Sequence, residues 1–201
     1  MSAVVIVGSQ WGDEGKGKIV DLATEHADVV VRYAGGPNAG HTLVVGSDKL
    51  VVRLVPSGIL QPHARCLMAQ GMVVDLGVLL GEIEALERRG VKVEGRLFVS
   101  GLAHLILPYH VLVDGLRETG PRKLGTTKKG IGPTYEDKEA QRGIRVGDLR
   151  DLERTRALIV AALEGWRPVV RSYDAELPSA DAILDELAPL AKRLLPLVAD
   201  T

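Results

Sequence analysis

Glycines, lysines and two carboxylates are interleaved near the amino terminus, in residues 12–18 with the sequence GDEGKGK. Closely spaced glycines let backbone N–H groups approach an anion, and a helix that begins near Gly15 would point its positive end at the same anion. The apolar residues 4–7 are predicted to form a strand before the loop, which is the context that a phosphate-binding loop requires. The segment therefore predicts phosphate chemistry with a built-in acid or base, and a glycine-rich surface turn is the weaker alternative.

The loop departs from the standard P-loop at its end. It fits the pattern G-x-x-x-x-G-K, but Ile19 stands where a standard P-loop has a Ser or Thr that holds Mg²⁺. Any metal must then be held by another group. Asp13 is the candidate, because a carboxylate that faces phosphates is repelled by them unless it binds a cation or takes a proton.

A second glycine-rich loop, residues 35–42 with the sequence GGPNAGHT, follows a predicted strand at residues 29–33. In parallel α/β sheets the loops that follow the strands gather at the carboxyl edge, so the two loops are expected to meet there. His41 is then a candidate general acid or charge stabiliser, since imidazole changes its charge near neutral pH. A histidine in an isolated loop is more commonly a surface residue, so this assignment depends on the first loop.

Residues 124–138 are a third candidate ligand segment, because they combine glycines and threonines with the basic pair Lys128 and Lys129. Such a stretch suits phosphate. Short basic runs are also common on solvated surfaces, so the residues alone leave both interpretations open.

Four segments in this order resemble the adenylosuccinate synthetase family: WGDEGKGK at 11–18, GGPNAGHT at 35–42, PSGIL at 56–60 and GTTKKGIGPTYEDK at 125–138. The resemblance spans nearly the whole chain. It implies a GTP-dependent ligase of purine (AMP) biosynthesis, in which GTP phosphorylates the 6-oxygen of IMP and the amino group of L-aspartate then displaces phosphate to give adenylosuccinate. It also implies Mg²⁺ as the cofactor and a homodimer as the assembly.

The resemblance assigns roles to motif positions. Asp13 would remove the N1 proton of IMP, His41 would stabilise charge on the transferred phosphate and act as the acid, and Lys16 would neutralise developing charge. The Asp13 carboxylate and the Gly40 carbonyl would hold Mg²⁺. The positions implied for GTP are Gly12, Asp13, Glu14, Gly15, Lys16, Gly17, Lys18, Gly40, His41 and Thr42. The positions implied for IMP are Asp13, Glu14, Gly15, Lys16, Asn38, Ala39, Gly40, His41, Thr127 and Gln141.

Two departures from the family bear on activity. Family members are generally much longer, and their later half supplies the guanine-recognising aspartate, an arginine-rich aspartate-binding loop and further IMP contacts, none of which has a counterpart in this sequence. Gln141 also stands where the family has an arginine that reaches across the dimer to the 5′-phosphate of IMP. A neutral amide cannot replace that charge, so IMP affinity is expected to suffer unless Arg142 or Arg145 substitutes. Arg53 and Gln70, where the family commonly has His and Asn, are milder departures.

Two hypotheses therefore remain. The first is an active ligase, or the amino-terminal part of one. The second is a non-catalytic remnant that binds phosphate ligands or forms dimers without turnover. A GTPase switch is weaker, because Ile19 replaces the metal-binding hydroxyl and no base-recognition motif follows.

The composition is typical of a soluble intracellular chain, with 201 residues, a net charge of −1 and 46% hydrophobic residues. No apolar stretch approaches the roughly 20 residues of a membrane span, and the amino terminus has no basic flank or cleavage site. The cytoplasm is the expected compartment, with no nucleic-acid or membrane partner. The single cysteine, Cys66, excludes an intrachain disulfide and is expected to be a buried thiol.

The apolar pattern predicts an α/β fold with a mixed, mainly parallel sheet flanked by helices. Strands are predicted at residues 4–7, 29–33, 42–46, 50–55, 66–69 and 97–100, with a hairpin turn at 45–50. Helices are predicted at 76–90, 152–166 and 183–198, so the part after Asp148 would be purely helical. We expect one incomplete domain, residues 1–201, with an α/β part at 1–148 and a helical part at 149–201. An open sheet edge would make it marginally stable or self-associating.

Overall fold

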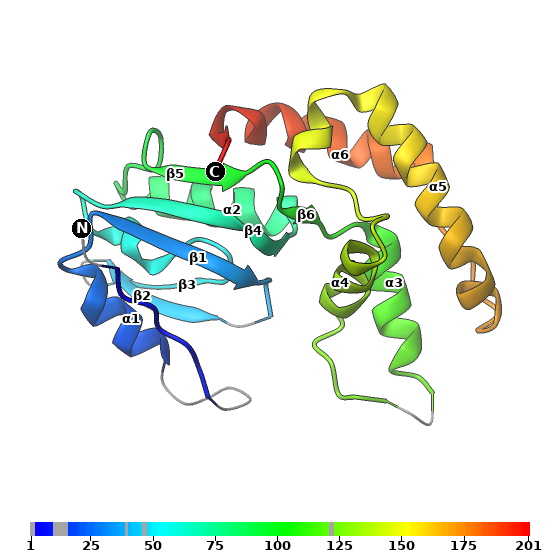
Figure 1. Cartoon of the computed structure of the whole chain (residues 1–201), viewed down its shortest axis with the longest axis horizontal. Coiled ribbons are helices and arrows are strands. Elements are labelled where there is room, and N and C mark those ends of the chain that lie inside the picture. Colours follow the sequence, from blue (N-terminus) through cyan, green and yellow to red (C-terminus); the bar gives the residue numbers. More distant parts are fainter. Residues whose placement is uncertain (1–2, 10–15, 39, 46–47, 121–122) are drawn as a thin grey trace.

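A mainly parallel sheet forms the centre of the molecule (Figure 1). The computed structural model describes residues 3–9, 16–38, 40–45, 48–120 and 123–201. The strands β1 (Val29–Gly35), β4 (Arg65–Val74), β5 (Leu97–Ser100) and β7 (Val198–Ala199) pair in the order β1-β4-β5-β7, and every pair is parallel. The short strand β6 (His104–Leu105) also pairs in parallel with β4. The predicted fold class is confirmed.

The predicted hairpin is also present. Strands β2 (His41–Val45) and β3 (Asp48–Val52) form a two-stranded antiparallel sheet in which His41 pairs with Val52. The turn residues Gly46 and Ser47 lie outside the described residues. The hairpin supplies the antiparallel component of this mixed fold.

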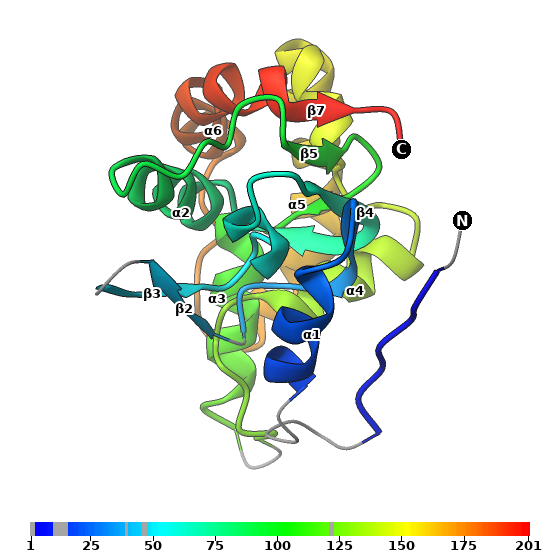
Figure 2. The same ribbon diagram turned by 90° about the vertical axis from the view of Figure 1, so that its left-hand side faces the viewer.

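Helices flank the sheet on both sides and extend beyond it (Figures 1 and 2). The α-helices are α1 (Lys16–Thr24), α2 (Leu76–Glu87), α3 (Pro108–Arg117), α4 (Ile131–Glu139), α5 (Leu152–Arg171) and α6 (Ala180–Leu194). Short 3-10 helices are Ser57–Leu60, Val146–Arg150 and Leu195–Leu197. Within the described ranges, no helix has the length and hydropathy needed to cross a membrane.

The long helix α6 packs against both α2 and α5, which joins the carboxyl-terminal helices to the sheet. Its residues Ile183 and Leu187 belong to the same core as Leu79 and Leu86 of α2. Helix α2 begins at Asp75, whose carboxylate caps the Val78 N–H at 3.0 Å. The chain then turns at Gly90, with a φ of 77°, as the predicted glycine stop signal requires.

The strand predicted at residues 4–7 is wrong. Residues 3–9 contain neither helix nor strand, and Val4, Val5 and Val7 are 81%, 75% and 67% exposed. Figure 2 shows this dark blue segment running apart from the sheet. An apolar run predicts that a segment can be buried, but a parallel strand also needs a neighbour that exchanges hydrogen bonds with it.

Two further predictions need correction. The part after Asp148 is not purely helical, because α6 ends at Leu194 and the chain forms β7 beside β5. The two residues of β7 are too few to show a strand pattern in the sequence. The second half of residues 124–138 is the helix α4 rather than a loop.

Cys66 is fully buried on β4, as predicted. Burial raises the pKa of its thiol to about 12, so it packs as a small apolar side chain.

Candidate functional site

The imidazole of His41 lies against the first turn of α1. A Cβ placed on Gly17 would be 3.4 Å from Cδ2 and 3.7 Å from Nε2 of His41. Gly17 belongs to the first glycine-rich segment and His41 to the second, so these described residues of the two segments lie together. The amino-terminal turn of a helix presents unpaired N–H groups and a positive dipole, so this junction is suited to an anion.

The surroundings of His41 favour its neutral form. Burial is the largest cause that lowers its pKa, the positive charges of Arg32 and Lys16 lower it further, and Asp21 acts in the opposite direction. A neutral imidazole still donates one hydrogen bond. A phosphate bound beside it would favour the protonated ring, because an adjacent anion raises the pKa of a histidine.

Arg32 on β1 supports the backbone of the second loop. Its guanidinium donates to the carbonyl of Gly36 at 3.0 Å and to the carbonyl of Arg53. Gly36 itself is buried, and a Cβ there would come within 2.8 Å of Cγ2 of Val73. The loop therefore lies close against the sheet. Sequence reasoning did not identify Arg32, although a charged residue inside an apolar strand was a visible signal.

The third segment is connected to the second loop. Lys129 donates from Nζ to the carbonyl of Pro37 at 2.8 Å. The carboxylate of Asp114 on α3 accepts from the Thr126 hydroxyl at 2.8 Å and from the Gly130 N–H at 2.8 Å. These bonds fix the course of the segment around Thr127, which is exposed.

A tyrosine anchors the start of the second loop. The Tyr135 hydroxyl on α4 accepts from the Gly35 N–H at 2.9 Å and donates to the Gly71 carbonyl at 2.9 Å. The helix that follows the third segment is thereby attached to the end of β1 at Gly35 and to β4 at Gly71. Gly35, Gly71 and Tyr135, which are far apart in the sequence, thus meet at the tyrosine hydroxyl.

The remaining predicted site residues differ in whether the structure describes them. Lys16, Lys18, Asn38, Gly40, Thr42 and Gln141 are exposed. The predicted positions Gly12, Asp13, Glu14, Gly15 and Ala39 lie outside the described residues.

Arg142, one of the two arginines that could substitute for the family arginine at position 141, already has partners. Its Nε donates to Asp137 at 2.6 Å, and its guanidinium carbon lies 5.2 Å from the ring centre of Trp166. Gln141 adopts a φ of 59° in the turn after α4. Arg145, which is exposed, is therefore the better candidate for that compensation.

The donors predicted for Mg²⁺ are oxygen atoms, which is the ligand type that this ion prefers. No group of three or more His, Cys, Asp or Glu side chains suited to a metal occurs among the described residues. At Gly40, a Cβ would lie 2.8 Å from Cγ1 of Val51, so this close approach of the two strands favours a residue without a side chain. The bare backbone there is compatible with a carbonyl ligand.

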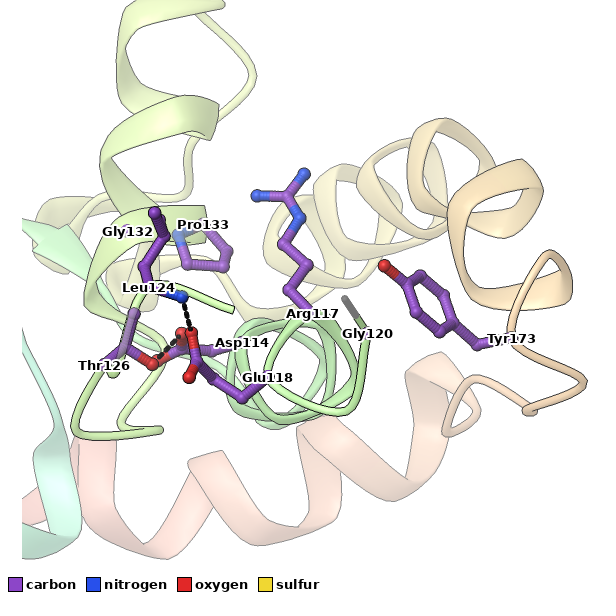
Figure 3. A pocket seen from close by; sticks show the side chains of 9 residues that line it. All are labelled: Asp114, Arg117, Glu118, Gly120, Leu124, Thr126, Gly132, Pro133 and Tyr173. Atoms are coloured by element: carbon purple, nitrogen blue, oxygen red, sulfur yellow. Dashed lines mark hydrogen bonds between the residues drawn. The ribbon is translucent and has the colours of Figure 1, made fainter. Parts of the chain in front are cut away.

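A cavity of about 320 Å³ lies beside the third segment (Figure 3). The residues that line it are Asp114, Arg117, Glu118, Gly120, Leu124, Thr126, Gly132, Pro133 and Tyr173. Its carboxylates already have internal partners, since Glu118 accepts from the N–H groups of Leu124 at 2.8 Å and Gly125 at 2.9 Å. His41 and Lys16, the predicted catalytic residues in the described part of the chain, do not line the cavity.

The family model for adenylosuccinate synthetase matches residues 5–201. The chain belongs to the adenylosuccinate synthetase family. It is 67% identical to the adenylosuccinate synthetase of Sorangium cellulosum and 51% identical to that of Myxococcus xanthus, covering 100% of this chain and 48% of each relative. The chain thus spans about half the length of the curated relatives it matches. The resemblance inferred from the four motifs is confirmed.

Two solved structures are similar to this fold. A fully ligated adenylosuccinate synthetase from Plasmodium falciparum matches with a TM-score of 0.81 and 33% identity, over 96% of this chain and 45% of that one. A succinoaminodeoxyadenylate synthetase of cyanophage S-2L, bound to dGMP and dATP, matches with a TM-score of 0.57 and 30% identity, over 71% of this chain and 40% of that one.

Proposed function

We propose that this chain supplies the phosphoryl-transfer loops of an adenylosuccinate synthetase, which joins IMP and L-aspartate at the expense of GTP. The observation that carries the proposal is the contact of His41 with the first turn of α1 at Gly17. It brings the imidazole to the place where a helix terminus favours phosphate. Membership of the family supports the same chemistry.

In the proposed reaction, Asp13 takes the N1 proton of IMP, and the 6-oxygen attacks the γ-phosphorus of GTP. The bond from that phosphorus to the bridging oxygen breaks and GDP leaves, which gives 6-phosphoryl-IMP. His41 and Lys16 stabilise the charge on the transferred phosphoryl group. The amine of L-aspartate then attacks C6, phosphate leaves with the 6-oxygen, and the amine loses a proton to give adenylosuccinate.

The same proposal includes Mg²⁺, held by the Asp13 carboxylate and the Gly40 carbonyl. When bound, the ion would neutralise negative charge on the phosphates of GTP. Asn38 and Thr127 would contact IMP, and a homodimer would bring Gln141 of one subunit to the IMP site of the other. Because glutamine is uncharged, this contact would bind the 5′-phosphate more weakly than an arginine does.

A second candidate is binding without turnover. It is favoured by the neutral Gln141, which offers no positive charge to a phosphate. Phosphoryl transfer requires its reactants in near-attack geometry, so binding of one nucleotide alone would not give catalysis.

The deciding experiment measures adenylosuccinate formation from IMP, GTP, Mg²⁺ and L-aspartate. The purified chain is assayed alone and with the carboxyl-terminal half of the Sorangium cellulosum relative added as a separate polypeptide; the intact relative is the positive control. Turnover in either arm supports the ligase if Asp13→Ala and His41→Asn each abolish it. The control variant His26→Asn should keep the wild-type turnover. His26 is exposed just after α1, which makes it a matched control. Nucleotide binding without turnover in both arms would instead establish the second candidate.

A further inference from the structure

Two charges of opposite sign, the buried Glu82 and the half-buried Arg32, enclose the backbone of Arg53. Glu82 on α2 is 8% exposed, and its carboxylate accepts from the N–H of Arg53 at 2.7 Å, of Leu54 at 3.0 Å and of Val55 at 3.1 Å. The carbonyl of Arg53 accepts from the guanidinium of Arg32. The N–H and the carbonyl of Arg53 are therefore both hydrogen-bonded to side chains from other elements.

These hydrogen bonds satisfy backbone groups that have left the β2–β3 hairpin. Strand β3 ends at Val52, and residues 53–55 continue as a bend into the interior, where Leu54 and Val55 are fully buried. An unpaired N–H at such a site costs about 1–3 kcal/mol. The three donors stabilise the carboxylate of Glu82 in turn. Burial lowers the pKa of the Arg32 guanidinium, and the negative charge of Glu82 acts in the opposite direction.

The same two side chains hold both ends of the segment that carries His41. On the entry side, Arg32 binds the carbonyl of Gly36 at 3.0 Å. On the exit side, Arg32 and Glu82 bind Arg53, which directly follows Val52, the register partner of His41. The hairpin is thus attached to the body of the protein immediately beside the imidazole.

We propose that Arg32 and Glu82 are a positioning pair that fixes the β2–β3 hairpin and thereby holds the His41 ring over the first turn of α1. The inference deepens the function proposed above, because His41 is the residue that is positioned. Neither side chain is assigned a contact with substrate.

If Arg32 and Glu82 were merely structural, their loss would change the stability of the whole chain and leave the contact of His41 with Gly17 unaltered in the molecules that remain folded. A positioning pair has a different signature. Its loss loosens the hairpin and displaces the ring, while helices α5 and α6 keep their structure.

The test uses the full 201-residue chain with ¹³C-labelled histidine rings and ¹⁵N-labelled amides at a fixed pH, without any ligand. Three quantities are measured: the nuclear Overhauser effect between the His41 ring and Gly17, the ring resonance of His41, and hydrogen exchange of the amides of residues 53–55. The variants are Glu82→Gln, Arg32→Gln and Arg32→Lys. The matched controls are Glu87→Gln on the exposed face of α2 and Arg171→Gln at the end of α5.

We expect Glu82→Gln and Arg32→Gln to speed exchange at residues 53–55 at least tenfold, to shift the ring resonance and to abolish the Overhauser effect. Exchange in α5 and α6 should stay as in the wild type. Arg32→Lys keeps the positive charge but cannot donate to both carbonyl groups in the geometry of a guanidinium, so it should weaken the Overhauser effect. This variant provides the test if the other two fail to fold. An unchanged ring resonance and Overhauser effect in any folded variant of this set would overturn the proposal.

Because these measurements need no turnover, an inactive chain still tests the pair. If adenylosuccinate formation is observed, Glu82→Gln should lower kcat about tenfold and leave KM for GTP within twofold. A wild-type kcat in that variant would contradict the positioning role without affecting the ligase assignment.

Discussion

The imidazole of His110 donates from Nε2 to the carboxylate of Asp137 across 2.9 Å, and both side chains are fully buried. The Nδ1 of the same ring accepts the Leu107 N–H at 2.9 Å, so the neutral ring carries its proton on Nε2. Asp137 also accepts from Trp166 at 3.0 Å and from Arg142 at 2.6 Å. Burial raises the pKa of Asp137, but these hydrogen bonds outweigh burial and hold it below its ordinary value.

Replacing that carboxylate should destabilise the whole helical region. We expect Asp137→Asn to lower the free energy of unfolding by about 2–4 kcal/mol, since an amide would turn a donor group toward buried donors. Urea titration followed by circular dichroism measures this change. Glu139→Gln, at an exposed position of the same helix, should stay within about 0.5 kcal/mol of the wild type. An equally small change in Asp137→Asn would show that the cluster contributes little.

His104 should make the fold sensitive to mild acid. Its ring is 6% exposed, and Nδ1 has no hydrogen-bond partner in the described part of the chain. Burial lowers its pKa from 6.5 to about 4, and the charges of Arg145 and Lys138 act in the same direction, whereas Asp148 opposes them. Between these two pH values the unfolded chain binds a proton that the folded chain does not. The stability is therefore complete above pH 6.5 and is lost as the pH falls towards 4, by on the order of 3 kcal/mol.

The measurement for His104 is the urea midpoint between pH 7.5 and pH 4.5. His104→Gln should show a shallower loss of stability with acid than the wild type, whereas His63→Gln, at an exposed site, should follow the wild-type slope. Parallel slopes in all three proteins would show that His104 does not titrate in this range.

Alanine substitutions at Gly71 and Gly81 compare a glycine that is close to neighbouring backbone with one that has open space around it. A Cβ on Gly71 would lie 2.1 Å from the carbonyl oxygen of Tyr33 in the neighbouring strand, whereas a Cβ on Gly81 in α2 meets nothing within 4 Å. Gly71→Ala must move sheet backbone and should cost about 3 kcal/mol or more. Gly81→Ala should be neutral or stabilise the chain by up to about 1 kcal/mol, because alanine favours the helix. Thermal unfolding of both variants checks the contrast; similar melting temperatures would show that β1 and β4 can separate at little cost.

The outer edge of β1 should promote self-association. Val29, Val31 and Tyr33 are 55%, 47% and 53% exposed, and β1 ends the strand order among the described strands. An exposed apolar edge strand is a template for pairing with another copy. Sedimentation velocity should show a weight that rises with concentration, and Val31→Lys should reduce this rise more than Val111→Lys on α3. A monodisperse monomer at every concentration would contradict the prediction.

The sequence predicted those elements whose evidence is local. The helix end at Gly90 and the hairpin turn at residues 45–50 are each signalled by a few adjacent residues, and the helix α2 and the β2–β3 hairpin are present. The strand at residues 4–7 failed because its pattern specifies burial but not a partner. In the site, the loop containing His41 was visible from its glycines. The contacts of Glu82 with Arg53 and Leu54 were not, because a hydrogen bond between residues 28 or 29 positions apart leaves no trace in either local sequence.

The pairing of β7 with β5 has a consequence for the order of folding. Val198 lies beside Val99, so this contact closes a loop that includes α3, α4, α5 and α6. During synthesis at about 5–20 residues per second, β5 emerges several seconds before β7, the strand that pairs with it. Contacts so distant in sequence form slowly, because the closure entropy of the loop opposes them until the whole segment is available. The nascent chain must therefore keep this edge of β5 without its β7 partner until residues 198–199 have left the ribosome, and during that interval the edge is exposed to misfolding.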